Sequence, residues 1–265
     1  MKKQIHHIKI FFLFTFFILF IFSCKNDKEE SYGKLQFNFN FNVNGSNLKT
    51  DTFLYTNAAG NPYLINNVQY FISNIALIKN DGSTFRLTKD GIFRYIDTDI
   101  PTTLSWMVSD AIPAGIYTSV AFTFGIKSYQ NKSNMFVNPP ESNMWWPDMM
   151  GGGYHNMKLN GKWLPPSQTI GNPFNIHLGI GMLKDNITGD TIFIDNSFDV
   201  KLALSPLSIH NESHIINLSM NIDSWFSTPN IYDFDTYGGA IMQSQPLMQM
   251  IKDNGIDVFS ATVVK

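Results

Sequence analysis

The segment from Leu35 to Val43 alternates strictly between apolar and polar side chains, and it ends at the turn pair Asn44-Gly45. Successive side chains of a β-strand point to opposite faces, so this period of two predicts a strand with one buried and one solvated face. Three further segments alternate in the same way, and one longer apolar segment predicts a more fully buried strand. The longer apolar segment is 68–78, and the three alternating segments are 120–126, 198–204 and 216–222.

Segments with helical periodicity are scarce. The best candidate spans 246–252, where Pro246 is tolerated in a first helical turn and Asn254-Gly255 is placed to end the helix. Many strands separated by Gly, Pro, Asn and Asp, without alternation of strands and helices, predict an all-β fold. We therefore expect a single antiparallel β-sandwich or barrel-like domain over residues 34–265, with a long loop rich in Met, Trp and Gly and a short C-terminal helix.

The first residues predict a leader and a lipid anchor. A basic start is followed by an apolar run of roughly 13 residues, short of the about 20 that cross a bilayer as a helix. Residues 21–24, Ile-Phe-Ser-Cys, resemble the lipobox of bacterial lipoproteins, in which the cysteine receives the lipid and becomes the new N-terminus. We expect a signal peptide over residues 1–23, lipidation at Cys24 and a charged, flexible tether over residues 24–33.

The predicted lipid anchor indicates where the protein is located, and its net charge limits the class of its partners. A lipidated chain would be attached to the membrane of a bacterial cell envelope, as an outer-membrane lipoprotein facing the periplasm or the exterior. After removal of the leader, about 16 basic residues stand against 21 acidic ones, and this net charge of about −5 argues against a nucleic-acid partner. Cys24 is the only cysteine, so no internal disulfide can form and stability must come from a large core.

The segment 131–167 breaks the strand pattern. It is rich in Pro, Gly, Met and Trp and is too long for a hairpin loop. Loops of this length inside a compact domain are usually functional or disordered, and this one carries too many large apolar side chains for disorder. It contains Trp145, Trp146 and His155, so it is the segment in which we expect a functional site.

His155 and His177 are candidate metal ligands. In the segment 174–178 the apolar residues have even numbers, so on a strand His177 would lie on the opposite face and could point into a cleft. His155 shares its parity with Met157 and could lie beside that thioether. Imidazole and thioether without cysteine suit copper better than zinc or a hard cation. The alternative is structural, since Met and Trp more often fill the core of a β-protein.

No motif indicates an enzyme. The chain has no P-loop, HExxH, CxxC or GxSxG motif and no complete GxGxxG motif. We therefore expect a protein that binds its ligand without catalysing a reaction.

The same residues resemble the MbnP-like copper-binding proteins. The resemblance implies a mostly β periplasmic or surface protein, encoded in many relatives beside a di-haem cytochrome c peroxidase-like enzyme that can oxidise a tryptophan to kynurenine. In the better-known relatives, histidines and that modified tryptophan hold copper. The segments that carry the resemblance are 153–161 and 174–179, with 144–146 before them and, as further landmarks in the same order, 34–43, 55–60, 68–75 and 115–125.

On this resemblance, the oxidised tryptophan would be Trp145 or Trp146, and His177 is the best-matched histidine. Asn160 stands where the family often has a glutamate, which removes a possible carboxylate ligand. Ligand softness adds two methionines as possible sulfur donors. The predicted copper-binding residues are, in chain order, Trp145, Trp146, Met150, His155, Met157 and His177.

The sequence thus predicts a lipid-anchored protein for acquisition, storage or delivery of copper, as Cu(I) or Cu(II). Only neutral imidazole binds a metal, so binding should weaken below pH about 6. One alternative is a surface lipoprotein that binds a carbohydrate or another organic nutrient, with Trp145 and Trp146 as a stacking platform. Another is a protein substrate or docking partner of a haem enzyme.

Overall fold

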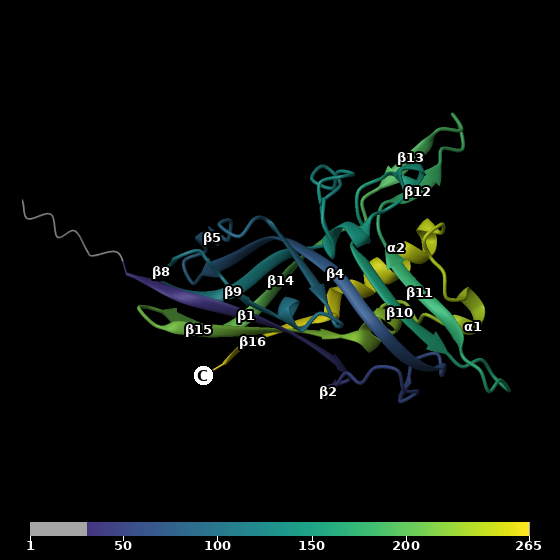
Figure 1. The fold of residues 1–265 in the computed structure, drawn as a ribbon, viewed down its shortest axis with the longest axis horizontal. Helices are drawn as coiled ribbons and strands as arrows, with labels where there is room; N and C mark the ends of the chain where they lie inside the picture. The colour runs from purple at the N-terminus through teal and green to yellow at the C-terminus, as the bar shows by residue number, and fades with distance from the viewer. Residues whose placement is uncertain (1–30, 265) are drawn as a thin grey trace, which may run out of the picture. The chain divides into compact units, whose positions relative to one another are not determined.

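The structure is a computed structural model, and it describes residues 31–264. Most of its regular elements are strands (Figure 1). The strands are β1 (Tyr32–Val43), β2 (Ser46–Asn47), β3 (Tyr55–Thr56), β4 (Pro62–Lys79), β5 (Thr84–Arg86), β6 (Phe93–Asp97), β7 (Ser105–Met107), β8 (Ile112–Pro113), β9 (Gly115–Phe124), β10 (Met157–Trp163), β11 (Asn172–Leu178), β12 (Gly181–Lys184), β13 (Thr191–Ile194), β14 (Phe198–Ile209), β15 (Ser213–Asn221) and β16 (Phe259–Val264). The α-helices are α1 (Phe234–Tyr237) and α2 (Gln245–Asn254), and the 3-10 helices are η1 (Pro101–Thr103), η2 (Glu141–Met144), η3 (Asp148–Met150), η4 (Ile222–Phe226) and η5 (Gly255–Asp257).

The elements predicted from periodicity are present. The five predicted strands correspond to β1, β4, β9, β14 and β15, and the C-terminal helix corresponds to α2. The Ser244 side chain accepts a hydrogen bond from the N–H of Leu247, which satisfies one of the free donors in the first turn of α2. The all-β class is therefore confirmed.

Two open sheets form a sandwich rather than a closed barrel within the described residues. The smaller sheet has the order β16-β15-β1-β2, with β7 and β8 also paired to β1. The larger has the order β11-β10-β4-β9-β14, with β3, β5 and β6 also paired to β4. Most pairs are antiparallel as predicted, but β1 and β15 run in parallel. The hairpin of β12 and β13 forms a separate small sheet, which stands away from β10 and β11 (Figure 1).

The main core lies between the two large sheets. Phe41 of β1 meets Tyr70 of β4 with ring centroids 6.1 Å apart, and Phe259 of β16 meets Phe124 of β9 at 5.5 Å. Burial of apolar surface contributes about 25 cal/mol per Å². A core that draws large aromatic side chains from both sheets can therefore stabilise the domain without a disulfide, as the cysteine content requires.

A second apolar cluster lies on the other face of the larger sheet. Its buried members include Phe71 of β4 together with Met144 and Tyr154 from the segment that was predicted as a long loop. The rings of Phe71 and Phe136 stack at 5.2 Å, and Phe136 meets Tyr154 edge-on at 4.8 Å. The irregular segment is thus held on the sheet by its large apolar side chains, as its composition predicted.

The predicted loop over 131–167 is wrong for residues 157–163. Residues Met157–Trp163 form β10, which lies between β11 and β4 inside the larger sheet. The buried residues Met157 and Leu159 alternate with the partly exposed Lys158 and Asn160, so the period of two was present. The surrounding Gly and Pro residues obscured it. The irregular part, which contains η2 and η3, spans 131–156.

Asn156 joins the end of this irregular segment to three neighbours. Its N–H donates to the carbonyl of Leu178 at 2.7 Å, and its carbonyl accepts from the N–H of Phe71 at 3.0 Å. Its side-chain oxygen accepts from the N–H of Ile126 at 3.0 Å. At Gly125, with φ +79°, a Cβ would collide with the Asn156 side chain, so the position requires glycine for both its conformation and its space.

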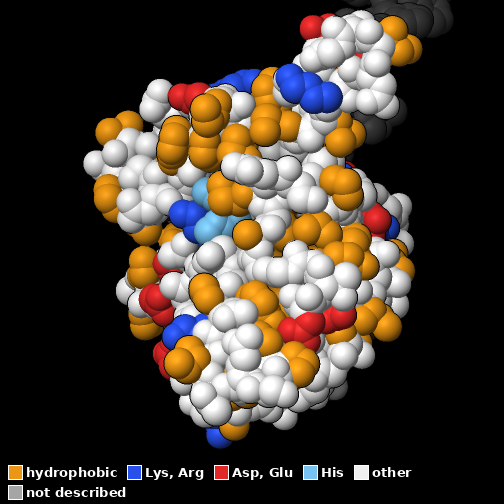
Figure 2. Space-filling view, turned by 90° about the vertical axis from the view of Figure 1, so that its right-hand side faces the viewer, with side chains coloured by type: hydrophobic (Ala, Val, Ile, Leu, Met, Phe, Trp, Pro, Cys, Tyr) orange, Lys and Arg blue, Asp and Glu red, His pale blue; other side chains and the backbone are white. Residues whose placement is uncertain are grey.

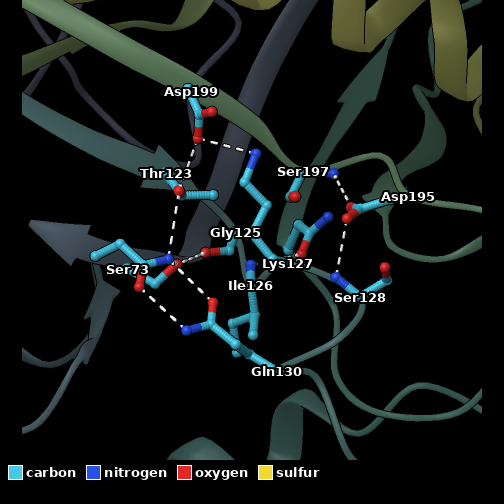
Figure 3. Close-up of polar contacts among 12 residues, drawn as sticks. Ser73, Thr123, Gly125, Ile126, Lys127, Ser128, Gln130, Asp195, Ser197 and Asp199 are labelled. Carbon is cyan, nitrogen blue, oxygen red and sulfur yellow. Dashed lines mark hydrogen bonds and ion pairs between the residues drawn. The ribbon is translucent and has the colours of Figure 1, made fainter.

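Polar contacts also hold the chain where β9 ends (Figure 3). The Ser73 hydroxyl donates to the carbonyl of Gly125 at 2.7 Å. The Lys127 ammonium lies 2.9 Å from the Asp199 carboxylate, which also accepts from the Thr123 hydroxyl at 2.8 Å. These contacts connect β4, β9 and β14 at the point where the chain leaves the sheet toward the segment 131–156.

Within residues 31–264, no helix is both long enough and apolar enough to cross a membrane. Cys24, the expected signal peptide and most of the expected tether lie outside the described residues, so lipid anchoring stays a prediction. β1 begins at Tyr32, inside the range expected for the tether.

Substitution of Gly125 should destabilise the fold more than substitution of a glycine with the same backbone conformation and free space. Gly82 has φ +85° and nothing within 4 Å of the position of a Cβ, so Gly82→Ala should cost only the left-handed backbone penalty of about 1–2 kcal/mol. Gly125→Ala should add a steric cost of about 1–3 kcal/mol from the Asn156 side chain. Urea unfolding of both variants measures the difference, and equal losses would contradict the role given to Asn156.

Candidate metal site

The structure brings His155 and His177 together. His177 lies on β11, on the face opposite the main core, and His155 lies two residues before β10 begins. The two ring centroids are 5.1 Å apart and the ring planes are nearly perpendicular, at 86°. Two imidazoles at this separation can approach one ion at about 2 Å per nitrogen. The convergence that the sequence predicted for these two residues is thus present in the fold.

The hydrogen bonds of His155 leave one ring nitrogen free. Its Nδ1 lies 2.8 Å from the carbonyl oxygen of Met144, and its backbone N–H donates to the same oxygen at 2.7 Å. A carbonyl oxygen can only accept, so Nδ1 carries the proton and Nε2 keeps its lone pair. This Nε2 atom is buried and has no hydrogen-bond partner. A buried hydrogen-bond acceptor without a partner is destabilising. The lone pair of Nε2 is therefore a candidate to bind a metal ion.

A chain of three hydrogen bonds determines which nitrogen of His177 is free. The Asp99 carboxylate, which can only accept, is 3.0 Å from Nδ2 of Asn67. Oδ1 of Asn67 then accepts from Nδ2 of Asn160 at 2.8 Å. This leaves Oδ1 of Asn160 to accept from Nε2 of His177, also at 2.8 Å. His177 therefore carries its proton on Nε2 and keeps the lone pair on Nδ1.

Both imidazoles are neutral at physiological pH. Burial, and to a smaller extent the positive charge of Lys158, lowers the pKa of His155 from 6.5 to about 3. Burial and the same lysine lower the pKa of His177 to about 4. Desolvation penalises the charged form of a buried group, so neither ring takes up a proton above pH about 4 to 5. Both lone pairs are therefore available without competition from protons.

Of the two candidate tryptophans, Trp146 borders the histidine pair. It is fully buried, and its ring meets the ring of His155 edge-on with centroids 4.7 Å apart. Its Nε1 donates to the carbonyl of Met150 at 3.0 Å. A Cβ at Gly179 would lie 2.5 Å from the indole, so glycine there makes room for the ring. Trp145 is 47% exposed, and with Trp146 buried the two rings do not form the stacking platform of the carbohydrate alternative.

Both predicted methionines lie in the main core, and Met157 is not on the face of the histidines. Met157 is fully buried in the main core, whereas its neighbour Lys158 lies opposite His177 across the β10–β11 pair. Met157 and His177 therefore occupy opposite faces of the sheet. The expected shared face of His155 and Met157 does not arise, because the strand begins only at Met157. Met150 is buried in the main core and offers its carbonyl to Trp146.

The site has a small opening to solvent. His155 is 4% exposed, while His177 is partly exposed. Figure 2 shows a histidine side chain at the surface beside a lysine or arginine side chain and next to a group of hydrophobic side chains. Among residues 31–264 no group of three His, Cys, Asp or Glu side chains is placed to hold a metal ion. The protein thus supplies two nitrogen donors, and no carboxylate or thiolate joins them.

The sequence interpretation missed the residues that support the histidines. Asn160 was noted only as a missing glutamate, yet its amide performs the hydrogen-bonding role of a supporting group for His177. Lys158 was not noted at all. Lys158 is paired with His177 across the β10–β11 ladder, and Asn160 lies on the same face of β10 two residues later. Recognition of β10 as a strand would therefore have placed both side chains on the face of His177.

The tautomers can be tested in the copper-free protein. We expect His155 to carry its proton on Nδ1 and His177 on Nε2, because the acceptors beside those atoms are carbonyl and amide oxygens. Asn160→Leu removes the acceptor and should give His177 a mixture of tautomers, whereas Asn160→Asp keeps an acceptor and should keep the Nε2–H form. Nitrogen-15 NMR of labelled histidine at neutral pH distinguishes the forms. An Nδ1–H form of His177 in the wild type would refute the assignment.

Comparisons with known proteins identify the family and the fold. The sequence model of the MbnP family, described as MbnP, matches residues 32–243. Among solved structures, MbnP from Methylosinus trichosporium is similar with a TM-score of 0.58 and 14% sequence identity, over 88% of this chain and 99% of that chain. At this identity the likeness shows a shared fold. No curated protein is significantly similar. Because the family match extends over most of the chain, the chain belongs to the MbnP family.

Proposed function

We propose that this protein binds one copper ion through Nε2 of His155 and Nδ1 of His177, without catalysing a reaction. Family membership supports a copper-related role. The observation that carries the proposal is the pair of neutral imidazoles with centroids 5.1 Å apart, one of which has a buried nitrogen with no partner. Such a site can acquire, store or deliver copper, because the partly exposed His177 gives the ion access to solvent.

The donor set favours Cu(I) over zinc and over Cu(II). Structural zinc sites almost always use four protein ligands, and catalytic ones use three. Here two imidazoles converge, and no group of three His, Cys, Asp or Glu side chains is present among the described residues. The sites that suit Cu(II) are tetragonal, with nitrogen and oxygen ligands. Neutral donors, an apolar neighbour in Trp146 and the positive charge of Lys158 all favour the ion with the lower charge.

The proposal includes maturation and location. Cys24 would carry the lipid, and the protein would act at the outer membrane on the periplasmic or external side. A di-haem cytochrome c peroxidase-like enzyme would oxidise one tryptophan to kynurenine. Contact with His155 favours Trp146 over Trp145 as that residue. Fragment-ion mass spectrometry of the native protein would locate the exchange of one carbon for one oxygen, and modification at Trp145 alone would contradict this choice.

Loss of either histidine should weaken copper binding by about tenfold or more, the scale seen when a metal site is disturbed. Competition titration of the mature chain with a Cu(I) chelator measures the affinity for wild type, His155→Ala and His177→Ala. His210→Ala is the matched control, because His210 is exposed and bonds only to the Ser208 hydroxyl at 3.0 Å. Unchanged affinity in His177→Ala would remove that residue from the site.

Copper binding should persist to a lower pH than the sequence alone suggested. In the folded protein the pKa values of the two imidazoles are about 3 and about 4, so protons compete with copper only as the pH approaches that range. Affinity corrected for the chelator's own titration should stay level from pH 7 to about 5 and then fall. Half-loss of affinity near pH 6 would contradict the burial of the rings.

The lowered pKa values of His155 and His177 also predict how the stability of the copper-free protein depends on pH. Both folded-state pKa values lie below the unfolded value of 6.5, so the unfolded chain takes up protons first. Stability should therefore fall as the pH decreases from about 6.5 toward 4. Urea unfolding of wild type and of His177→Ala over this range should show a shallower pH slope for the variant.

A further inference from the structure

A cavity of about 180 Å³ lies at the free edge of β6, and no residue of the histidine site lines it. Within the described residues β6 is paired with β4 alone, so no strand covers its other edge. The residues that line the cavity include the aromatic Phe93, Trp106 and Phe136 and the charged Arg94 and Glu141. Apolar walls with a few charged groups are typical of sites for small molecules.

The backbone of β6 presents hydrogen-bonding groups to this cavity. Ile92 and Thr98 bond to β4 through their backbone, so even-numbered residues point toward β4 and odd-numbered residues toward the free edge. At that edge the N–H of Asp97 donates to the Thr103 hydroxyl at 2.9 Å. The backbone of Tyr95 makes no such bond in the described part of the chain, although Tyr95 is only 6% exposed. Its N–H is therefore available to a ligand.

Arg94 brings hydrogen-bond donors to the cavity that the protein leaves unused. Its guanidinium lies over the Trp106 ring at 4.2 Å, and its side chain is 28% exposed. The Asp90 carboxylate lies 3.6 Å from Nη2 of Arg94, which is too long for a hydrogen bond. The Nε atom of Arg94 is buried and has no partner within residues 31–264. A guanidinium has five N–H donors and binds carboxylates as a fork, so Arg94 can hold the carboxylate of a ligand.

Glu141 adds a negative charge to the same cavity. It is partly buried, and the ion pairs within 4.0 Å among the described residues do not include it. Burial lowers the pKa of Arg94, and the charges of Asp90 and Glu141 oppose that shift. Phe93 and Phe136, which meet edge-on at 5.8 Å, supply aromatic rings. An ammonium group is stabilised by a carboxylate and by aromatic faces, so the cavity suits a positive group as well as a carboxylate.

We propose that this cavity binds a small zwitterion, the size of a free amino acid, that carries one carboxylate and one ammonium group. The carboxylate binds the Arg94 guanidinium and the N–H of Tyr95, and the ammonium binds the Glu141 carboxylate. A simple anion would be repelled by Asp90 and Glu141, and a simple cation by Arg94, so a zwitterion matches the charges better than either. The step is a reversible association in which no bond is broken, and it does not depend on copper.

Titration with three related compounds tests this inference. L-Alanine is the zwitterion, propionate keeps its carboxylate without the ammonium, and ethylammonium keeps its ammonium without the carboxylate. Nitrogen-15 NMR of the mature chain at pH 7 should show saturable binding of L-alanine that shifts the amide signal of Tyr95. Propionate and ethylammonium should each bind more weakly by about tenfold or more, the scale of one lost hydrogen bond to a charged group. Equal affinity for L-alanine and propionate, or no binding of L-alanine, would overturn the inference.

Substitutions test the two ends of the ligand separately. Glu141→Gln should lower the affinity for L-alanine toward that for propionate, and Glu141 has no ion pair within the described residues that its substitution would break. Arg94→Lys keeps the positive charge but not the fork, and should weaken L-alanine binding by about tenfold or more. Arg86→Lys is the matched control, because Arg86 is exposed and lines a different cavity. Unchanged affinity in Arg94→Lys or Glu141→Gln would also overturn the inference.

Discussion

The site depends on the way one buried amide, Asn156, connects strands that are distant in sequence. Its backbone bonds to Leu178 on β11 and to Phe71 on β4, and its side chain bonds to Ile126 after β9. His155 is the residue immediately before it. Each of these bonds is made away from solvent, where an unmade bond would cost about 1–3 kcal/mol. The position of His155 relative to the sheet is therefore determined by backbone geometry rather than by a flexible loop.

The second histidine is positioned by sheet register, and the two positions together prepare the donor atoms. His177 is held on β11, and Asn160 on the adjacent strand directs its protonated nitrogen away from the site. Burial keeps both rings neutral. The imidazoles are thus already desolvated and neutral in the folded protein without copper. Copper binding therefore requires neither the release of a proton nor a change of tautomer. A preorganised donor pair of this kind loses little entropy when it binds.

Much of the fold could be predicted from the sequence, because a period of two is a local property. The alternation at 35–43 and at 216–222 predicted β1 and β15 but not their parallel pairing, which depends on contacts between the chain's two ends. β10 was missed because Gly161 interrupts its apolar pattern and because neighbouring Trp, Met and Gly residues are typical of a loop. The pairing of His155 with His177 could be proposed only from the family resemblance. Sequence spacing does not determine which strands become neighbours.

The misplacement of β10 explains why the supporting residues were also missed. Once Met157–Trp163 is a strand between β11 and β4, Met157 must face the core, and Lys158 and Asn160 must face the histidines. A one-residue change of register would exchange these two sets, bringing a thioether to the site and burying the ammonium in the core. The polarity of the site, with soft neutral nitrogen donors beside one unpaired positive charge, therefore follows from the register of a single strand.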